Sequence, residues 1–234
     1  MLLSSYDSNP RPWRYLLILT GVSSESILID WLSALQDQSV EAIAVLGPDP
    51  FGAKQDRIVL THYPASVLDA AIALADSDDF GVPWRDSDAS LVAWQDIGKS
   101  ADAKQSQWRR LWLAHGYQSL VRVEFPLPAN RAFECFMFSS RSWHDRAEAA
   151  SVTWSALNIW PLLKRALAAE KSPLTAREAE CLVLAFEGLS GRETSIKLGC
   201  SERTVAFHLA NAMAKLKVDN KLAAIQRACW CGLI

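Results

Sequence analysis

The sequence predicts an α+β sandwich domain, with helices on both faces of a sheet, followed by an all-α domain of four helices. Segments with the period of a strand alternate with helical segments up to about residue 170. The clearest strand pair, 118–127 and 131–139, is joined by the short connection 128–130. Beyond residue 173 every apolar pattern is short and helical.

The first part of the chain changes element type repeatedly. Strands are indicated by β-branched and aromatic residues between turn signals, and helices by apolar residues three and four apart. The expected elements are a helix over 27–35, strands over 41–46 and 57–63, a helix over 64–75, a strand over 90–94, a helix over 103–115, the strand pair, and a helix over 142–170. We expect this last helix to kink at Pro161.

A domain boundary is indicated near Pro173, which cannot continue the preceding helix. We therefore expect a first domain over 1–168, a linker over 169–173 and a second domain over 174–234.

Capping residues divide the second domain into helices. Thr175, with Glu178 three residues later, begins the first helix, and Gly199 ends the second at a left-handed position. Ser201 caps the third helix, and a fourth ends at Gly232. The expected buried residues are Ala179, Leu182, Val183 and Phe186 of the first helix and Val205, Leu209, Met213 and Leu216 of the third.

A short second helix, a tight turn with glycine and a capped third helix are typical of the helix-turn-helix, which places its third helix in the major groove of DNA. The alternative is a small bundle whose polar residues only face water. The positions expected to contact DNA are Ser201, Arg203, Thr204, Ala206, Phe207, Ala210, Asn211 and Lys215.

Charge alone does not identify the partner. The chain has a net charge of -2, but residues 172–234 carry 8 Lys/Arg against 6 Asp/Glu, and residues 1–171 carry 16 against 20. Only the second domain has a net positive charge, which favours binding to a polyanion, and this charge is small.

Composition excludes several classes of protein. No apolar run approaches the ~20 residues of a membrane span, and the N-terminus lacks the pattern of a secretory signal, so we expect a cytoplasmic protein without a membrane partner. The five cysteines are scattered, so we expect reduced, mostly buried thiols and no metal site. The four dispersed histidines and the lack of a Gly-rich phosphate loop argue against an enzyme.

Residues 174–190, 199–208, 215–218 and 232–234 resemble the LuxR-type helix-turn-helix in both residues and spacing. That family often has a DNA-facing Lys or Arg where this chain has Ala206, and Ala210 is similarly small. The resemblance implies DNA binding, but the operator sequence does not transfer. Apolar contact with a thymine methyl is one alternative way of reading bases here.

The first domain resembles the acyl-homoserine-lactone-binding domain of quorum-sensing regulators, through residues 62–64, 94–96, 114–117 and 125–126. The resemblance implies ligand positions at Val67, Ala71, Asp79, Trp94 and Arg122. Val67 and Ala71 stand where the family has Trp and Tyr, so a buried lactone carbonyl loses its donor at a cost of about 1–3 kcal/mol. We therefore expect no ordinary response to these lactones, and a different small molecule is the alternative ligand. No cofactor is expected.

Structural alternatives exist for the remaining ligand positions. Asp79 is either a ligand acceptor or a solvated loop acid, and Trp94 is either a ligand contact or a core residue. Arg122 and Glu124 share one face of a strand, which points either inward or to solvent.

The resemblance implies a homodimer on a palindromic site in double-stranded DNA. The alternative is an interaction protein that inhibits a related regulator by forming a heterodimer, a hypothesis motivated by Ala206 and Ala210.

Overall fold

The computed structural model describes residues 22–49, 51, 57–77, 92–98, 106–127, 131–143 and 145–234. These residues belong to two units, one over Ser23–Lys171 and another that includes Ser172–Ile234. The first combines a sheet with helices and the second contains helices, which confirms the expected fold class.

The sheet of the first unit is antiparallel throughout, with the strand order β2-β1-β5-β4-β3. β4 and β5, the clearest pair in the sequence, lie at its centre beside β1. The strands are β1 (Ala42–Pro48), β2 (Arg57–His62), β3 (Val92–Asp96), β4 (Ser119–Leu127) and β5 (Arg131–Ser139).

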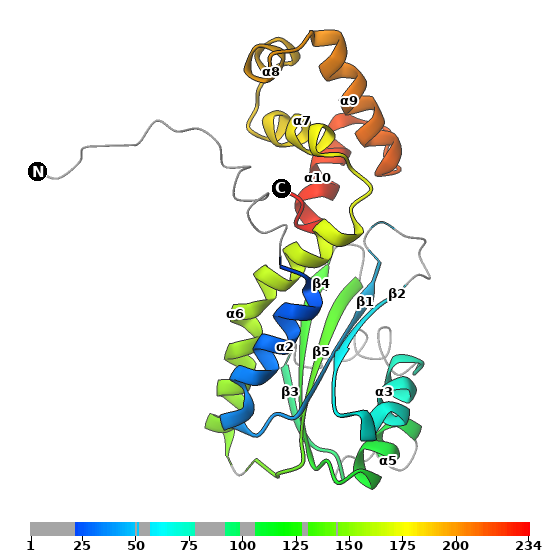
Figure 1. Ribbon diagram of the computed structural model, residues 1–234, viewed down its shortest axis with the longest axis vertical. Coiled ribbons are helices and arrows are strands. Elements are labelled where there is room, and N and C mark those ends of the chain that lie inside the picture. The colour runs from blue at the N-terminus through cyan, green and yellow to red at the C-terminus, as the bar shows by residue number, and fades with distance from the viewer. Residues whose placement is uncertain are drawn as a thin grey trace, which may run out of the picture. The chain divides into compact units, whose positions relative to one another are not determined.

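Helices cover both faces of this sheet (Figure 1). α2 (Ser24–Ala34) and α6 (Arg146–Lys171) pack together on one face. α3 (Leu68–Ala75) and α5 (Gln107–Ala114) pack together on the other. Short 3-10 turns at Gln36–Gln38 and Ala65–Val67 lead into β1 and α3.

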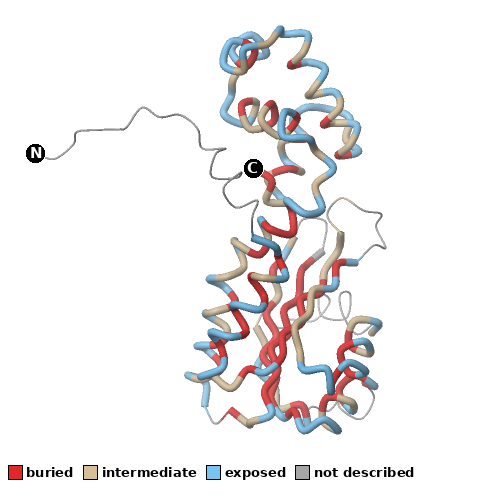
Figure 2. Tube along the Cα trace, viewed as in Figure 1, coloured by how far each residue is buried: buried red, intermediate tan, exposed pale blue. Residues whose placement is uncertain are grey.

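Alternation along the strands builds two cores. Val121 and Met137 face α2 and α6, whereas Leu120 and Phe138 face α3 and α5. The central strands are therefore buried along most of their length (Figure 2), as expected for a sheet covered on both sides. On the α3/α5 face, Trp112 stacks on Phe138 with ring centroids 3.7 Å apart and an interplanar angle of 3°.

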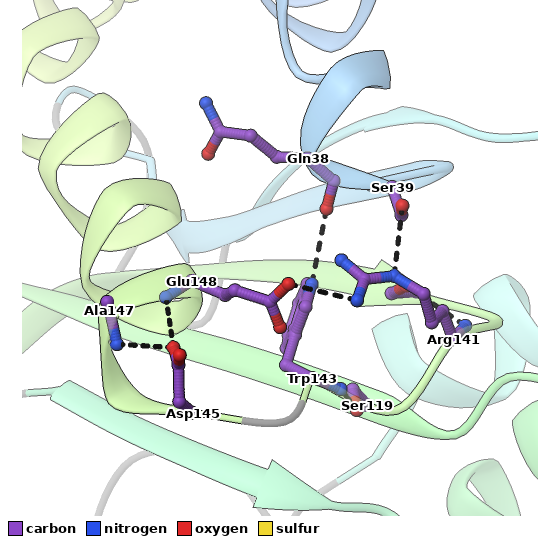
Figure 3. A network of polar contacts seen from close by, with 9 residues as sticks. Gln38, Ser39, Ser119, Arg141, Trp143, Asp145, Ala147 and Glu148 are labelled. Carbon is purple, nitrogen blue, oxygen red and sulfur yellow. Dashed lines mark hydrogen bonds and ion pairs between the residues drawn. The ribbon is translucent and has the colours of Figure 1, made fainter.

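A polar network fixes the connection from β5 to α6 (Figure 3). The Arg141 guanidinium donates to Glu148 at 3.0 Å and to the Ser39 hydroxyl at 3.2 Å. The indole nitrogen of Trp143 donates to the carbonyl of Gln38. Asp145 accepts from the backbone amides of Ala147 and Glu148, so its carboxylate satisfies donors in the first turn of α6.

α6 contains Pro161 within one continuous helix. It ends at Lys171 and so overlaps the first three residues of the expected linker 169–173. Its last turn is held by Glu170, whose carboxylate accepts from the amide and the hydroxyl of Ser24 at 2.6 and 2.7 Å. Ser172 precedes Pro173 and is therefore disfavoured in a helix.

The second unit has four helices over residues 172–234: α7 (Ala176–Phe186), α8 (Gly191–Leu198), α9 (Glu202–Lys215) and α10 (Lys221–Cys231). Their positions agree with the capping pattern in the sequence. The expected core differs in detail. Phe186 is 59% exposed, and Leu209 and Met213 are only half-buried, whereas Ala212 is fully buried. α9 packs closely on α7 and α8, and such close packing favours small residues.

All five cysteines are free, but only Cys135 and Cys181 are buried, and the other three are half-buried. Burial raises the pKa of the Cys181 thiol to about 11, which keeps it protonated and unreactive. In the part of the chain that the structure describes, no helix combines the length and the apolar composition needed to cross a bilayer.

Candidate functional site

The turn between α8 and α9 depends on Gly199, which has φ 65° and ψ 38°. Only glycine adopts this left-handed conformation without a steric cost. α8 is held at its other end by a capping box, in which the Ser190 amide and the Glu193 carboxylate pair at 2.8 Å while the Ser190 hydroxyl accepts from the Glu193 amide. α8 is thus a short helix with a defined cap at each end, and a tight turn joins it to α9. This arrangement is helix-turn-helix geometry.

Ser201 caps α9. Its hydroxyl oxygen accepts from the Thr204 amide at 3.1 Å and lies 2.8 Å from the Thr204 hydroxyl. The positive end of the helix dipole is therefore at the exposed start of α9, where it favours an anion. Thr204 is half-buried, and its hydroxyl takes part in the cap. Only part of this side chain is therefore available for a contact with DNA.

α9 divides into a buried and an exposed face. Val205, Ala212 and Leu216 are buried against the rest of the unit. The opposite face leaves five of the expected DNA-contacting positions exposed: Ser201, Arg203, Ala206, Phe207 and Ala210. Asn211 is half-buried at the margin of this face.

Lys215 has a different environment from the other expected DNA contacts. Its ammonium donates to the Glu178 carboxylate at 2.8 Å, and Glu178 is only 3% exposed. Glu178 also accepts from the amide of Thr175 at 2.7 Å, which completes the capping box of α7. Lys215 therefore ties the end of α9 to the start of α7, a link that the sequence pattern did not reveal.

The ionisation of Glu178 follows from these contacts. Burial raises the pKa of this carboxyl, but the hydrogen bonds from Lys215 and Thr175 outweigh burial and hold the pKa below its ordinary value. The charged pair is thus the favoured form in the folded unit.

The ligand positions expected in the first unit separate into two groups. Val67 and Ala71 are buried on the α3/α5 face beside Leu74 and Phe136. Arg122 also belongs to this face, because its cross-strand partner is Phe136. Trp94 lies opposite Val121 in β3 and therefore on the α2/α6 face, where it is 38% exposed. Asp79 lies outside the described residues.

Trp94 therefore lies on the opposite face of the sheet from Val67, Ala71 and Arg122. Side chains of a strand alternate between faces, so the register of β3 against β4 decides on which side Trp94 lies, and this register could not be read from the sequence.

Arg122 points inward and is only 2% exposed. Its guanidinium donates to Glu134 at 3.1 Å and to Glu124 at 2.9 Å, and both carboxylates are largely buried. Glu134 was missed, although the short connection between β4 and β5 would have placed it directly opposite Glu124. The guanidinium is thus engaged by carboxylates of the protein itself.

A groove of about 640 Å³ lies between α3 and α5. Its lining includes Asp69, Ile72, Trp108 and Leu111, but none of Val67, Ala71 and Arg122. Among the described residues, no three His, Cys, Asp or Glu side chains gather as metal ligands would.

Known proteins share the helix-turn-helix of the second unit. Residues 172–228 match the family described as bacterial regulatory proteins, luxR family. The transcriptional activator LuxR of Aliivibrio fischeri is 52% identical over 61 residues, which are 26% of this chain and 24% of LuxR. The match therefore spans only about a quarter of LuxR.

Longer matches extend into the first unit. The transcriptional activator SolR of Ralstonia solanacearum is 31% identical over 203 residues, covering 84% of this chain and 80% of SolR. The crystal structure of Escherichia coli SdiA aligns with 95% of this chain and with 98% of the SdiA chain, at 20% sequence identity and a TM-score of 0.50. This match supports the fold.

Lys215→Met is expected to destabilise the second unit by about 1–3 kcal/mol, because it leaves the Glu178 carboxylate buried with fewer partners. Hydrogen exchange at the amides of α7 and α9 in the full chain measures this loss. Lys197→Met is the matched control, because the pair of Lys197 with Glu187 is exposed and contributes little.

The same contacts predict a pH dependence. Since the pKa of Glu178 is depressed in the folded state, its stabilisation is present above the ordinary glutamate pKa and is lost as the pH falls through the folded value. Glu178→Gln should flatten the loss of protection below about pH 5. Equal acid sensitivity of this variant and the unmodified chain would contradict the assignment.

Proposed function

Since the chain belongs to the LuxR family of bacterial regulatory proteins, we propose that it is a DNA-binding transcriptional regulator of the quorum-sensing type that acts as a dimer on palindromic sites. Residues 1–168 serve sensing and dimerisation in this proposal, and residues 174–234 bind DNA. The observation that carries it is the exposed face of the capped helix α9.

Several features of α9 suit the major groove. The N-terminal turn is exposed and carries Arg203, so a guanidinium and the positive end of the helix dipole lie together. α9 is held from behind by α7 and α8, which leaves its outer face accessible within the unit. Base and phosphate contacts are assigned to Ser201, Arg203, Thr204, Ala206, Phe207, Ala210 and Asn211. Lys215 takes a structural role through Glu178 instead.

Dimerisation is supported by apolar side chains exposed on one helix of each unit. In α6, Trp154 and Leu157 are 66% and 43% exposed and lie one turn apart. In α10, Leu222 and Trp230 are 74% and 40% exposed. A contiguous exposed apolar patch is typical of a surface that a partner covers, and Trp154 and Leu157 lie close enough along α6 to form one. A second copy of the chain is the partner that a palindromic site requires.

An altered ligand site is also part of the proposal. On the α3/α5 face, Val67 and Ala71 offer no side-chain donor, and Leu120 is buried there as well. Arg122 is occupied by Glu124 and Glu134. A lactone on this face would lack hydrogen-bond partners from these positions, and would have to displace close aromatic packing.

Arg203→Ala is expected to weaken binding to a selected DNA duplex by about tenfold or more. It should also reduce the slope of the logarithm of the binding constant against the logarithm of the salt concentration by about one. Fluorescence anisotropy over a range of salt concentrations measures both effects. Arg177→Ala is the control, since Arg177 is in α7 and pairs with Glu180. If the purified homodimer binds no duplex selectively, the alternative of an inhibitor that forms heterodimers replaces this proposal.

Acyl-homoserine lactones with short and long chains should leave the melting temperature of the purified chain unchanged, because Val67 and Ala71 provide no side-chain donor for the lactone. Differential scanning fluorimetry with and without each lactone tests this. A rise of several degrees with any of them would show that the pocket is functional.

Leu222→Lys should raise the dissociation constant of the dimer by about tenfold or more, because it places a charge in an apolar contact. Sedimentation equilibrium of the full chain measures the constant. Ile196→Lys, at a residue of α8 that is 73% exposed, is the matched control and should leave the dimer intact. Equal effects of both substitutions would argue against α10 as a dimer contact.

A further inference from the structure

Five exposed residues form one stripe along the outer face of α9. Arg203, Ala206, Phe207, Ala210 and Ala214 are all exposed, and helical periodicity places them within about 100° of arc. We call this set the α9 stripe. Any role for the stripe in reading bases rests on the proposed DNA-binding function, because the stripe is the part of α9 that would face the groove.

The chemistry of the α9 stripe is unusual for a surface that reads bases. Four of its five side chains are apolar, and Arg203 alone can donate a hydrogen bond. Base edges in the major groove present donors and acceptors, and the one apolar group among them is the C5 methyl of thymine. Apolar side chains gain most where they meet that methyl, and they leave the polar edges of other bases unsatisfied.

We propose that the α9 stripe selects DNA by contact with thymine methyl groups, so that the preferred site has A·T base pairs facing Ala206, Phe207 and Ala210. Phe207 is the largest member and is 61% exposed. Its ring meets the His208 ring edge to face, with 6.0 Å between the centroids. That contact leaves most of the Phe207 ring accessible to a partner.

The polar residues beside the stripe agree with this preference. Asn211 is half-buried at its margin, and an asparagine amide in the major groove pairs well with adenine, the partner of thymine. The Thr204 hydroxyl is already paired with Ser201. Arg203 lies in the first turn, where phosphate is as accessible as a guanine edge. Donors for guanine are therefore few. In an A·T pair, by contrast, Asn211 suits the adenine and the apolar residues of the stripe suit the thymine methyl.

The experiment begins with duplexes selected by the purified full chain from a library with a randomised core. The selected duplex is then synthesised with deoxyuridine in place of thymidine, which removes only the methyl groups and keeps the hydrogen-bonding pattern. Each buried methyl contributes about 0.8 kcal/mol, or roughly a fourfold change in affinity. Replacement throughout the contacted positions should weaken binding by about tenfold or more. Replacement in the flanking sequence should have no effect.

A pair of protein variants shows whether the α9 stripe senses the methyls. The readout is the dissociation constant of the deoxyuridine duplex divided by that of the thymidine duplex. Phe207→Ala should lower this ratio towards one. Phe186→Ala is the matched control, because Phe186 is also a phenylalanine of the second unit, is 59% exposed and lies on α7. This control should keep the full ratio. A loss of folding would change both affinities and not their ratio.

The outcomes separate this inference from the function on which it rests. Selective binding that weakens with deoxyuridine supports both. Selective binding that is insensitive to deoxyuridine overturns the recognition of thymine methyls by the α9 stripe, and so does a selected site without thymine at the contacted positions. Either result leaves the proposed regulator function standing. Absence of selective binding overturns both.

Discussion

The arrangement of the second unit depends on the buried carboxylate of Glu178. It accepts from the amide of Thr175, which begins α7, and from the ammonium of Lys215, which ends α9. One side chain therefore fixes the start of one helix to the end of another. The orientation of α9, and with it the face that α9 presents, follows from this contact together with the burial of Val205, Ala212 and Leu216.

Much of the second unit was predictable because its signals are local. A cap acts over three residues and a left-handed glycine over one, so Thr175, Ser201 and Gly199 identified the helix ends correctly. The contacts between helices were less predictable. Phe186 has helical spacing suited to a core position but is exposed, and Lys215 binds a carboxylate 37 residues away. Such pairings depend on how the helices cross, and the period of one helix does not determine that crossing.

The first unit shows the same division between local and distant information. The strand pair β4 and β5 was correctly predicted, because a short connection fixes its register. That register also determines the opposition of Glu124 and Glu134, and so the surroundings of Arg122. β3 reaches β4 through a long connection, so nothing in the sequence determined the face on which Trp94 lies. A shift of one residue would have moved it to the other face.

The weak charge of the second unit and the apolar face of α9 have a common consequence. Net +2 over residues 172–234 provides little attraction to phosphate, and Lys197 and Lys215 are each paired with a carboxylate. A single subunit with one arginine and three alanines on its reading face would bind any duplex weakly. Two subunits on one duplex convert the second contact into an intramolecular event and raise the overall affinity without new contacts. Under the proposed function, the exposed residues of α6 and α10 therefore matter for affinity as much as α9 does, because dimer stability sets how much DNA is bound.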